Sequence, residues 1–292
     1  MIKKWVVGIV LLVLAVSTYG QQYDPESDFN AVRDSYGGVK IIGYTGSKRI
    51  VNIPPQIRNL PVTFIGEFAF SDKRLTSVTI PNGVIYIGDS AFANNQLTSV
   101  TIPNSVTRID RGAFANNQLT SITIPNNVTS LSGFDNNQLT SVTIPSSVRS
   151  IAGFNNNRLT SITIPDSVDY IGTEAFANNR LTSVTIPDSV TYIGFSSFAN
   201  NQLTSVTIPN KITGILDNAF ENNRLTSITI PDSVTYIGIG VFANNQLTRI
   251  SISRRVEIRH GAFENNFIDF YRNHERRAGT YVYRNGSWSE DW

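Results

Sequence analysis

Short stretches in which apolar and hydroxyl-bearing residues alternate recur along most of the chain. In Leu75–Pro81 the apolar Val78 and Ile80 alternate with Ser77 and Thr79, and the proline follows at once. A period of two over a β-branched run indicates a strand with one buried face. Proline ends such a strand because it has no N–H to donate to a ladder. Each stretch therefore predicts one short strand.

The stretch returns at regular intervals. Self-similarity at such a period is typical of a stack of small units, in which neighbouring units complete the core that one unit cannot bury alone. The leucines that open the copies are separated by 22, 22, 20, 20, 22, 22, 22 and 22 residues. They are Leu75, Leu97, Leu119, Leu139, Leu159, Leu181, Leu203, Leu225 and Leu247. The spacing predicts a single elongated solenoid.

Each unit carries a second apolar set after its proline. In the unit that opens at Leu159, this set ends in Ile171, Ala175 and Phe176. The pattern L-x-x-I-x-I-P-x-x-V-x-x-I-G-x-x-A-F resembles the repeat of the bacterial BspA-like, treponemal-type leucine-rich repeat family, and it holds over residues 60–267. The resemblance implies a leucine-rich repeat solenoid of about ten coils of 20–22 residues plus caps. It also implies a parallel β-sheet on the concave face and a mostly irregular, short-stranded convex side.

The first twenty residues are typical of a secretory signal peptide. Lys3 and Lys4 precede an apolar run, Val6–Val16, that is too short for a comfortable membrane span. Thr18 and Gly20 are the small residues expected before a cleavage site. We expect export to the cell surface, the medium or the periplasm, with no stable membrane span once the signal is removed. An uncleaved N-terminal anchor is the alternative.

The flanks of the array differ from its coils. Residues 21–59 hold one degenerate copy of the strand, Ile50–Pro54, and residues 267–292 are rich in aromatic side chains. The open ends of a stacked core need covers. We therefore expect a signal peptide at 1–20, an N-terminal cap at 21–59, the solenoid at 60–266 and a C-terminal cap at 267–292.

Composition narrows the chemistry. The chain has no cysteine, which excludes disulfides, thiolate metal sites and a cysteine nucleophile. Its formal net charge of +2 matches Lys3 and Lys4 of the signal, so the exported chain is near neutral and lacks the basic footprint of a nucleic-acid binder. Only two histidines, His260 and His274, are present, and the recurring aspartates stand singly after proline. We expect no enzymatic activity, no cofactor and no metal.

Two columns of residues are candidates for binding. The hydroxyl residues of the strands form one column, which the resemblance places on the concave sheet, and tyrosines of the second apolar set form the other. Each column also has an explanation without binding. The hydroxyl residues fit as solvent-facing residues of a strand, and the tyrosines fit as side chains that cover the turn beneath them. The hydroxyl column includes Ser99, Thr101, Ser121, Thr123, Ser141, Thr143, Ser161, Thr163, Ser183, Thr185, Ser205 and Thr207. The tyrosine column holds Tyr86, Tyr170, Tyr192 and Tyr236.

Two further features concern the turns. Pairs of asparagine, such as Asn94-Asn95, precede most of the leucines, and we expect one member of each pair to point inward and bond to loop backbone. The coils from Leu119 and Leu139 are each two residues short, after Leu131 and after Ile151. Because the loss spares the strand motif, the strand-bearing face is expected to run unbroken, while the opposite side of the stack has a local notch. The notch is either a recognition feature or a tolerated length variant.

Together these features favour an exported, non-catalytic protein that binds other proteins. The resemblance implies surface adhesion to proteins of a host or of neighbouring cells. A periplasmic or envelope structural protein that associates with itself is the main alternative. Binding to ice or a crystal surface is a second alternative, favoured by regular hydroxyl columns and disfavoured by a curved sheet.

Overall fold

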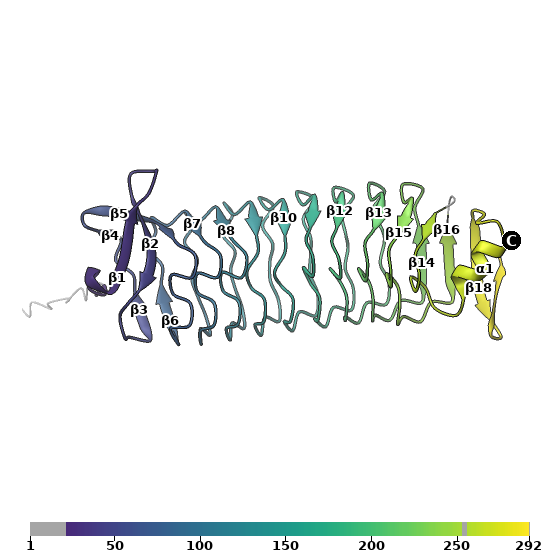
Figure 1. The fold of residues 1–292 in the computed structure, drawn as a ribbon, viewed down its shortest axis with the longest axis horizontal. Helices are drawn as coiled ribbons and strands as arrows, with labels where there is room; N and C mark the ends of the chain where they lie inside the picture. The colour runs from purple at the N-terminus through teal and green to yellow at the C-terminus, as the bar shows by residue number, and fades with distance from the viewer. Residues whose placement is uncertain (1–21, 253–255, 292) are drawn as a thin grey trace, which may run out of the picture.

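The computed structural model describes residues 22–252 and 256–291, and within them the chain forms one long stack of coils (Figure 1). Residues 22–59 lie at one end of the stack and residues 267–291 at the other. The predicted signal peptide, residues 1–20, lies outside the described residues. Helices within the described ranges are too short or too polar to cross a membrane.

A parallel ladder of short strands runs along one side of the stack. Each coil contributes two residues, of which the second, isoleucine or leucine, is buried and the first faces outward. One sheet continues through β5 (Leu60–Ile65), β7 (Tyr86–Ile87), β8 (Arg108–Ile109), β9 (Ser130–Leu131), β10 (Ser150–Ile151), β11 (Tyr170–Ile171) and β12 (Tyr192–Ile193). A second, three-stranded sheet holds β13 (Gly214–Ile215), β15 (Tyr236–Ile237) and β17 (Glu257–Ile258).

The hydroxyl-bearing stretches form strands only near the two ends. There, β3 (Ile50–Asn52) pairs with β6 (Ser77–Thr79), and β14 (Ser227–Ile230) pairs with β16 (Arg249–Ile252). Two isolated bridges, Thr123–Thr143 and Thr163–Thr185, lie between them. On this face the backbone bonds between central coils are long: the Thr140 N–H reaches the Thr120 carbonyl at 3.4 Å, and the Thr182 N–H reaches the Thr160 carbonyl at 3.3 Å. The prediction of an unbroken sheet on this face is therefore wrong. The longest ladder runs through the tyrosine column instead, from β5 to β12, and a separate ladder follows from β13 to β17.

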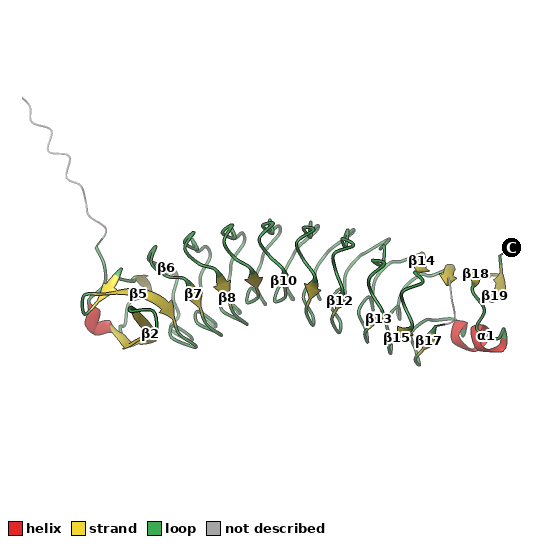
Figure 2. Ribbon diagram, turned by 90° about the horizontal axis from the view of Figure 1, so that it is seen from above, coloured by secondary structure: helices red, strands yellow, loops and turns green. Residues whose placement is uncertain are grey.

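The stack bends, and the ladder lies on the inner side of the bend, with β6 and β14 towards the outer side (Figure 2). Hydrogen-bonded strands sit about 4.7–4.9 Å apart, and the stacked rings of Tyr170 and Tyr192 on the ladder side are 4.6 Å apart. Buried phenylalanine rings in successive coils are 5.0–5.9 Å apart. Ring spacing along the ladder is 4.6 Å at the Tyr170–Tyr192 pair and 5.5 Å between Phe64 and Tyr86, so it overlaps the spacing of the buried rings. The expected architecture, a leucine-rich repeat solenoid with a parallel sheet on its concave face, is confirmed.

Two columns of side chains fill the interior and join the coils. The first is a stack of phenylalanine rings in which neighbouring planes lie within 25° of each other. Together with the buried leucine, isoleucine and valine side chains of each coil it forms the apolar core. Dispersion contacts accumulate along such a stack because every ring touches two others. The column holds Phe70, Phe92, Phe114, Phe134, Phe154, Phe176, Phe198, Phe220, Phe242 and Phe263.

The second column consists of the inward asparagines, and it confirms the expectation for the asparagine pairs. The Asn117 amide nitrogen donates to the carbonyls of Phe92 and Phe114 at 3.0 and 3.1 Å. Its oxygen accepts the N–H of Leu97 at 3.0 Å. The partner residue Asn116 is exposed and takes a left-handed backbone with φ of 55°, which asparagine tolerates. One residue of each pair makes the turn and the other satisfies buried backbone.

Antiparallel strands cover the N-terminal end. A 3-10 helix, Glu26–Asp28, leads into β1 (Phe29–Arg33), which pairs with β2 (Val39–Tyr44), while β4 (Gln56–Ile57) pairs with β5. Tyr44 stacks on Phe70 at 5.5 Å and so closes the phenylalanine column.

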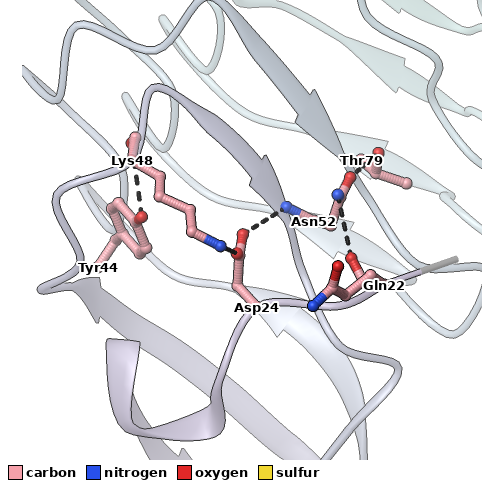
Figure 3. A network of polar contacts seen from close by, with 6 residues as sticks. All are labelled: Gln22, Asp24, Tyr44, Lys48, Asn52 and Thr79. Atoms are coloured by element: carbon pink, nitrogen blue, oxygen red, sulfur yellow. Dashed lines mark hydrogen bonds and ion pairs between the residues drawn. The ribbon is translucent and has the colours of Figure 1, made fainter.

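A polar network ties the first described residues to this end (Figure 3). Asp24, which is 5% exposed, accepts Lys48 Nζ at 2.5 Å and the N–H of Asn52 at 2.8 Å. Asn52 in turn accepts the Thr79 hydroxyl at 2.8 Å. The segment before β1 is thereby anchored to the first coils.

The C-terminal end is covered by a helix and a hairpin. α1 (Phe267–Asn273) brings Phe267 edge-on against Phe263 at 5.1 Å. β18 (Gly279–Arg284) pairs antiparallel with β16, and β19 (Ser287–Glu290) pairs with β18. The apolar column thus ends against side chains at both ends, while the segment boundaries at residues 59 and 266 stay predictions.

Candidate binding surface

Aromatic, arginine and serine side chains stand in a row along the inner side of the bend. Within each of the two sheets the ladder pairs the outward-facing residues in register, so each lies directly beside its equivalent in the next strand. We call this set the inner row. Its members are Phe64, Tyr86, Arg108, Ser130, Ser150, Tyr170 and Tyr192, followed in the second sheet by Gly214, Tyr236 and Glu257.

The N-terminal part of the inner row is fixed by contacts among its own side chains. The Tyr86 ring meets Phe64 edge-on at 5.5 Å, and the Arg108 guanidinium lies 5.7 Å from the Tyr86 centroid. Asp110 accepts the Tyr86 hydroxyl and pairs with Arg108 Nε at 2.5 Å. Burial and the bond to Asp110 raise the pKa of Tyr86 to about 12. These side chains are therefore held in one geometry before any partner arrives.

The C-terminal part of the row is also aromatic. Tyr170, 40% exposed, stacks parallel on the half-buried Tyr192. Burial, and then the neighbouring Tyr170, raise the pKa of Tyr192. Further along, Arg259 lies 5.7 Å from the ring centroid of Tyr236. Tyrosine and arginine in such exposed, preordered positions are the residue types that dominate protein interfaces.

A hollow of about 800 Å³ runs beside the inner row, lined by residues from Glu67 to Glu174. The two coils that are two residues short contribute Ser132, Asp135, Ala152 and Asn155 to its lining. The shortened turns project less far than those of the other coils. The predicted notch therefore lies beside the inner row. We call it the central hollow. The side chains that define it are Arg111, Asp135, Asn155, Tyr170 and Glu174.

Glycines make the short turns possible. Gly133 and Gly153 have φ of 113° and 70°, a region that residues with a side chain avoid. A Cβ on Gly133 would lie 2.5 Å from the Asp110 carbonyl oxygen. Only glycine therefore fits where these coils close early.

The floor of the central hollow is polar, and sequence reasoning missed it. Asp135 and Asn155 are half-buried there. Burial raises the pKa of Asp135 to about 6, with Arg111 lowering it and Glu174 raising it. A weak signal was present in the sequence: the position before the asparagine pair is alanine in five coils, Asp135 and Asn155 in the two short ones, and Glu221 in one full-length coil. Those alanines are Ala93, Ala115, Ala177, Ala199 and Ala243.

The predicted hydroxyl column lies apart from the inner row, on the outer side of the bend rather than on the concave sheet. Its central stretches are exposed, and the structure does not bring them together with the tyrosines. Whether they bind a partner stays a prediction. The residues concerned are Ser99, Thr101, Ser121, Thr123, Ser141, Thr143, Ser161, Thr163, Ser183, Thr185, Ser205 and Thr207.

The titratable residues elsewhere are scattered. His274 places Nδ1 2.8 Å from the Phe270 carbonyl and stacks on the Phe270 ring. His260 lies beside the C-terminal helix. Across the part of the chain that the structure describes, no three histidine, aspartate or glutamate side chains lie close enough to hold a metal.

Several solved structures are similar to this chain. YopM from Yersinia enterocolitica is 17% identical with a TM-score of 0.52, over 72% of this chain and 44% of that one. A leucine rich cell surface protein from Faecalibacterium prausnitzii is 22% identical with a TM-score of 0.40, over 85% of this chain and 97% of that one. The T. pallidum leucine rich repeat protein is 22% identical with a TM-score of 0.39, over 76% and 89%. No curated protein matches the chain.

The match to a protein family is more specific. Six copies of the BspA type leucine rich repeat region match residues 51–153 and 152–269. These residues carry the phenylalanine and asparagine columns and the whole inner ladder from β7 to β17. The chain belongs to the BspA-type leucine-rich repeat family.

Proposed function

We propose that this protein is exported and binds a protein partner, without catalysis, through the concave inner row. The observation that carries the proposal is the register of the ladder, which aligns Tyr86, Arg108, Tyr170 and Tyr192 on one half-exposed face. Adhesion to proteins of a host or of neighbouring cells is the role that this arrangement serves. The proposal of export rests on the signal-like residues 1–20.

Preorganisation supports this surface over the outer one. Tyr86 and Arg108 are tied to Asp110, and Tyr170 is tied to Tyr192, so little side-chain freedom is lost on binding. A partner that covers these rings removes apolar area from water while the hydroxyl tips keep polar contacts. The outer hydroxyl column offers neither aromatic rings nor charge.

Self-assembly in the envelope has less support. Copies that stack end to end would need an open apolar end on each coil array. Tyr44 covers Phe70 at one end, and Phe267 and Trp288 pack together at the other, 4.8 Å apart. The ends of the array are therefore poor sites for a second copy.

The test compares two triple variants that differ in the face they alter. One carries Tyr86→Ser, Tyr170→Ser and Tyr192→Ser, a residue that the same ladder already accepts at Ser130 and Ser150. The other carries Thr143→Glu, Thr163→Glu and Thr185→Glu on the outer side. Binding to immobilised matrix proteins and bacterial surface proteins is measured by surface plasmon resonance, with folding checked by circular dichroism.

We expect the tyrosine variant to bind at least about a hundredfold more weakly, because each lost interface tyrosine is worth roughly 1–2 kcal/mol. The threonine variant should bind within about threefold of the wild type. Loss of binding in the threonine variant alone would move the site to the outer hydroxyl column and overturn the proposal.

A further inference from the structure

We propose that a slot at the C-terminal end of the inner ladder binds an extended, acidic segment of the partner protein as an added strand. The slot is a cavity of about 660 Å³ between β17, the last strand of the ladder, and α1 (Figure 2). We call it the terminal slot. Its walls are residues 256–260 on the ladder side and Ile268, Tyr271, Arg272 and Arg276 on the helix side. The inference rests on the proposed function only in taking the partner to be a protein.

The inner ladder ends at β17 with an open edge. In a parallel ladder, alternate residues of a strand point their backbone groups to the two neighbouring strands. Glu257 donates its N–H to the Thr235 carbonyl of the preceding coil at 2.9 Å. Arg259 donates its N–H to the Ile237 carbonyl, also at 2.9 Å. Ile258, which lies between them, therefore points its N–H and its carbonyl away from the preceding coil and toward the slot.

Side chains of α1 replace the missing strand only in part. The Tyr271 hydroxyl accepts the Val256 N–H at 3.3 Å. An Arg272 Nη reaches the Ile258 carbonyl at 3.5 Å, the outer limit of a hydrogen bond. The Ile258 N–H donates to no protein group within the described residues, although Ile258 is only 7% exposed. An unpaired backbone donor in a buried residue costs free energy, and the carbonyl of a further strand would pair with it.

The terminal slot is also basic. Three arginines line it against one carboxylate, that of Glu257. Arg259 lies 3.6 Å from Glu257, and Arg272 lies 3.9 Å from Asp269, an acid outside the slot. Arg276 is half-buried and has no ion pair within the described residues. A guanidinium in this state attracts a carboxylate and repels a cationic segment.

A tight turn after α1 places Arg276 at the wall of the slot. Glu275 and Arg276 both have left-handed backbone, with φ of 59° and 53°, a region that few residues other than glycine and asparagine adopt. The Arg276 N–H donates to the Tyr271 carbonyl at 3.0 Å, and the Tyr271 hydroxyl donates to the Arg276 carbonyl at 3.1 Å. The turn is thus fixed from both sides, and its unpaired guanidinium lies beside the open edge.

The register of the ladder sets the sequence that fits. In the coils before the slot, the residue after the ladder isoleucine donates to the preceding strand, as the Gly238 N–H does to the Ile215 carbonyl at 2.8 Å. An added parallel strand would place an apolar residue beside Ile258 and an outward residue beside Arg259. Glutamate at this outward position meets the basic wall, and its own N–H faces the Ile258 carbonyl. The slot therefore selects an apolar residue followed by an acid in an extended segment, the recognition mode of strand addition.

The test uses the probe acetyl-Ser-Ile-Glu-Ser-amide, titrated into the ¹⁵N-labelled full chain. One control replaces the glutamate with lysine. A second carries a methyl group on the glutamate nitrogen, which keeps the charge but removes the donor to the Ile258 carbonyl. We expect a saturable shift and slower hydrogen exchange at the Ile258 amide with the probe. The methylated peptide should bind at least about fivefold more weakly, and the lysine peptide should not saturate.

Two protein variants test the charge. Arg276→Gln should weaken binding of the probe at least about fivefold, because it removes the unpaired guanidinium. Arg224→Gln makes the same change at an exposed position of the array outside the slot and should alter binding less than about twofold. Circular dichroism checks that both variants fold.

Four results would overturn the inference. Equal binding of the methylated peptide, or the same shifts with inorganic phosphate, would indicate an anion site without strand addition. Equal loss in both arginine variants would indicate attraction by overall charge. A dimer of the chain that the probe dissociates would assign the open edge to a second copy.

The outcome is distinguishable from that of the proposed function. The probe reports on the terminal slot alone, whereas the Tyr→Ser and Thr→Glu variants report on partner binding along the two faces. A failed probe titration beside a loss of partner binding in the tyrosine variant removes only the slot.

Discussion

A Cβ atom added to Gly153 would lie 2.3 Å from the backbone nitrogen of Gly133 in the preceding coil. The two glycines pack backbone against backbone where the short turns lie. This contact lets the ladder of β9 and β10 continue in register although both coils have lost two residues. The central hollow therefore exists because these turns are both short and free of side chains.

Gly153→Ala should destabilise the protein by about 2–4 kcal/mol, since it combines a left-handed backbone with a direct clash. Gly261→Ala is the matched control: its φ of 68° resembles the 70° of Gly153, but its added Cβ would meet nothing within 4 Å. We expect a loss of only about 1 kcal/mol there. Urea unfolding monitored by circular dichroism measures the free energy of unfolding of both variants. Equal losses would show that the close approach of Gly153 to Gly133 does not contribute to stability.

The inward asparagines should be the most costly polar residues to remove. Asn179 accepts the Leu159 N–H at 3.0 Å and donates to the Phe154 carbonyl at 2.9 Å. Asn179→Ala leaves these buried groups unpaired, and we expect a loss of about 3–5 kcal/mol. Asn178→Gly, at an exposed position with φ of 55°, should be neutral or slightly stabilising. Thermal unfolding of both variants measures the difference. Equal melting temperatures would contradict the assignment of these hydrogen bonds to Asn179.

Asp135 should make stability depend on pH. Its folded-state pKa of about 6 lies above the ordinary value of about 3.9, so the folded state binds this proton more tightly than the unfolded state. This contribution is fully present below pH 4 and is lost as pH rises through 6. Asp135→Asn should therefore raise the free energy of unfolding at pH 7.5, on the order of 2 kcal/mol, and the gain should vanish near pH 4. Urea titrations at both values check it, and a gain independent of pH would refute the assignment.

One buried hydroxyl should be dispensable. Ser197 is fully buried, and its Oγ has no partner within the described residues. The equivalent position is Ala91 or Ala175 in other coils. Ser197→Ala should stabilise the fold by about 1 kcal/mol, whereas Ser205→Ala on the exposed outer face should change little. A lower melting temperature for Ser197→Ala would indicate that the hydroxyl has a role.

The sequence predicted the solenoid and its coil length because both follow from local periodicity. It also predicted the inward asparagines. A polar residue that recurs at a fixed position in every coil is expected to hydrogen-bond to backbone groups that the turn leaves unpaired. It did not predict which apolar set carries the ladder. The Leu75–Pro81 stretch and the Tyr86–Ile87 pair both read as strand, and the choice depends on small differences in spacing that accumulate over many coils.

The candidate site shows the same division. The shortened coils were visible in the spacing of Leu119, Leu139 and Leu159, and so a notch was expected. Its position beside the inner row follows from the direction of curvature, which no single repeat encodes. Asp135 stands out only when the coils are compared position by position.

The central claim is that the protein presents its concave face to a partner outside the cell, and the absence of cysteine allows a direct test. Thr173→Cys places one thiol in the central hollow, and Ser161→Cys places one on the outer face, both at exposed positions. Intact producing cells are treated with a membrane-impermeant maleimide, and labelling rates are compared with those of the purified variants. We predict that Ser161→Cys labels equally fast in both settings, while Thr173→Cys labels more slowly on cells because a partner covers it. Labelling of either thiol only after permeabilisation, or equal rates for both on intact cells, would contradict the account.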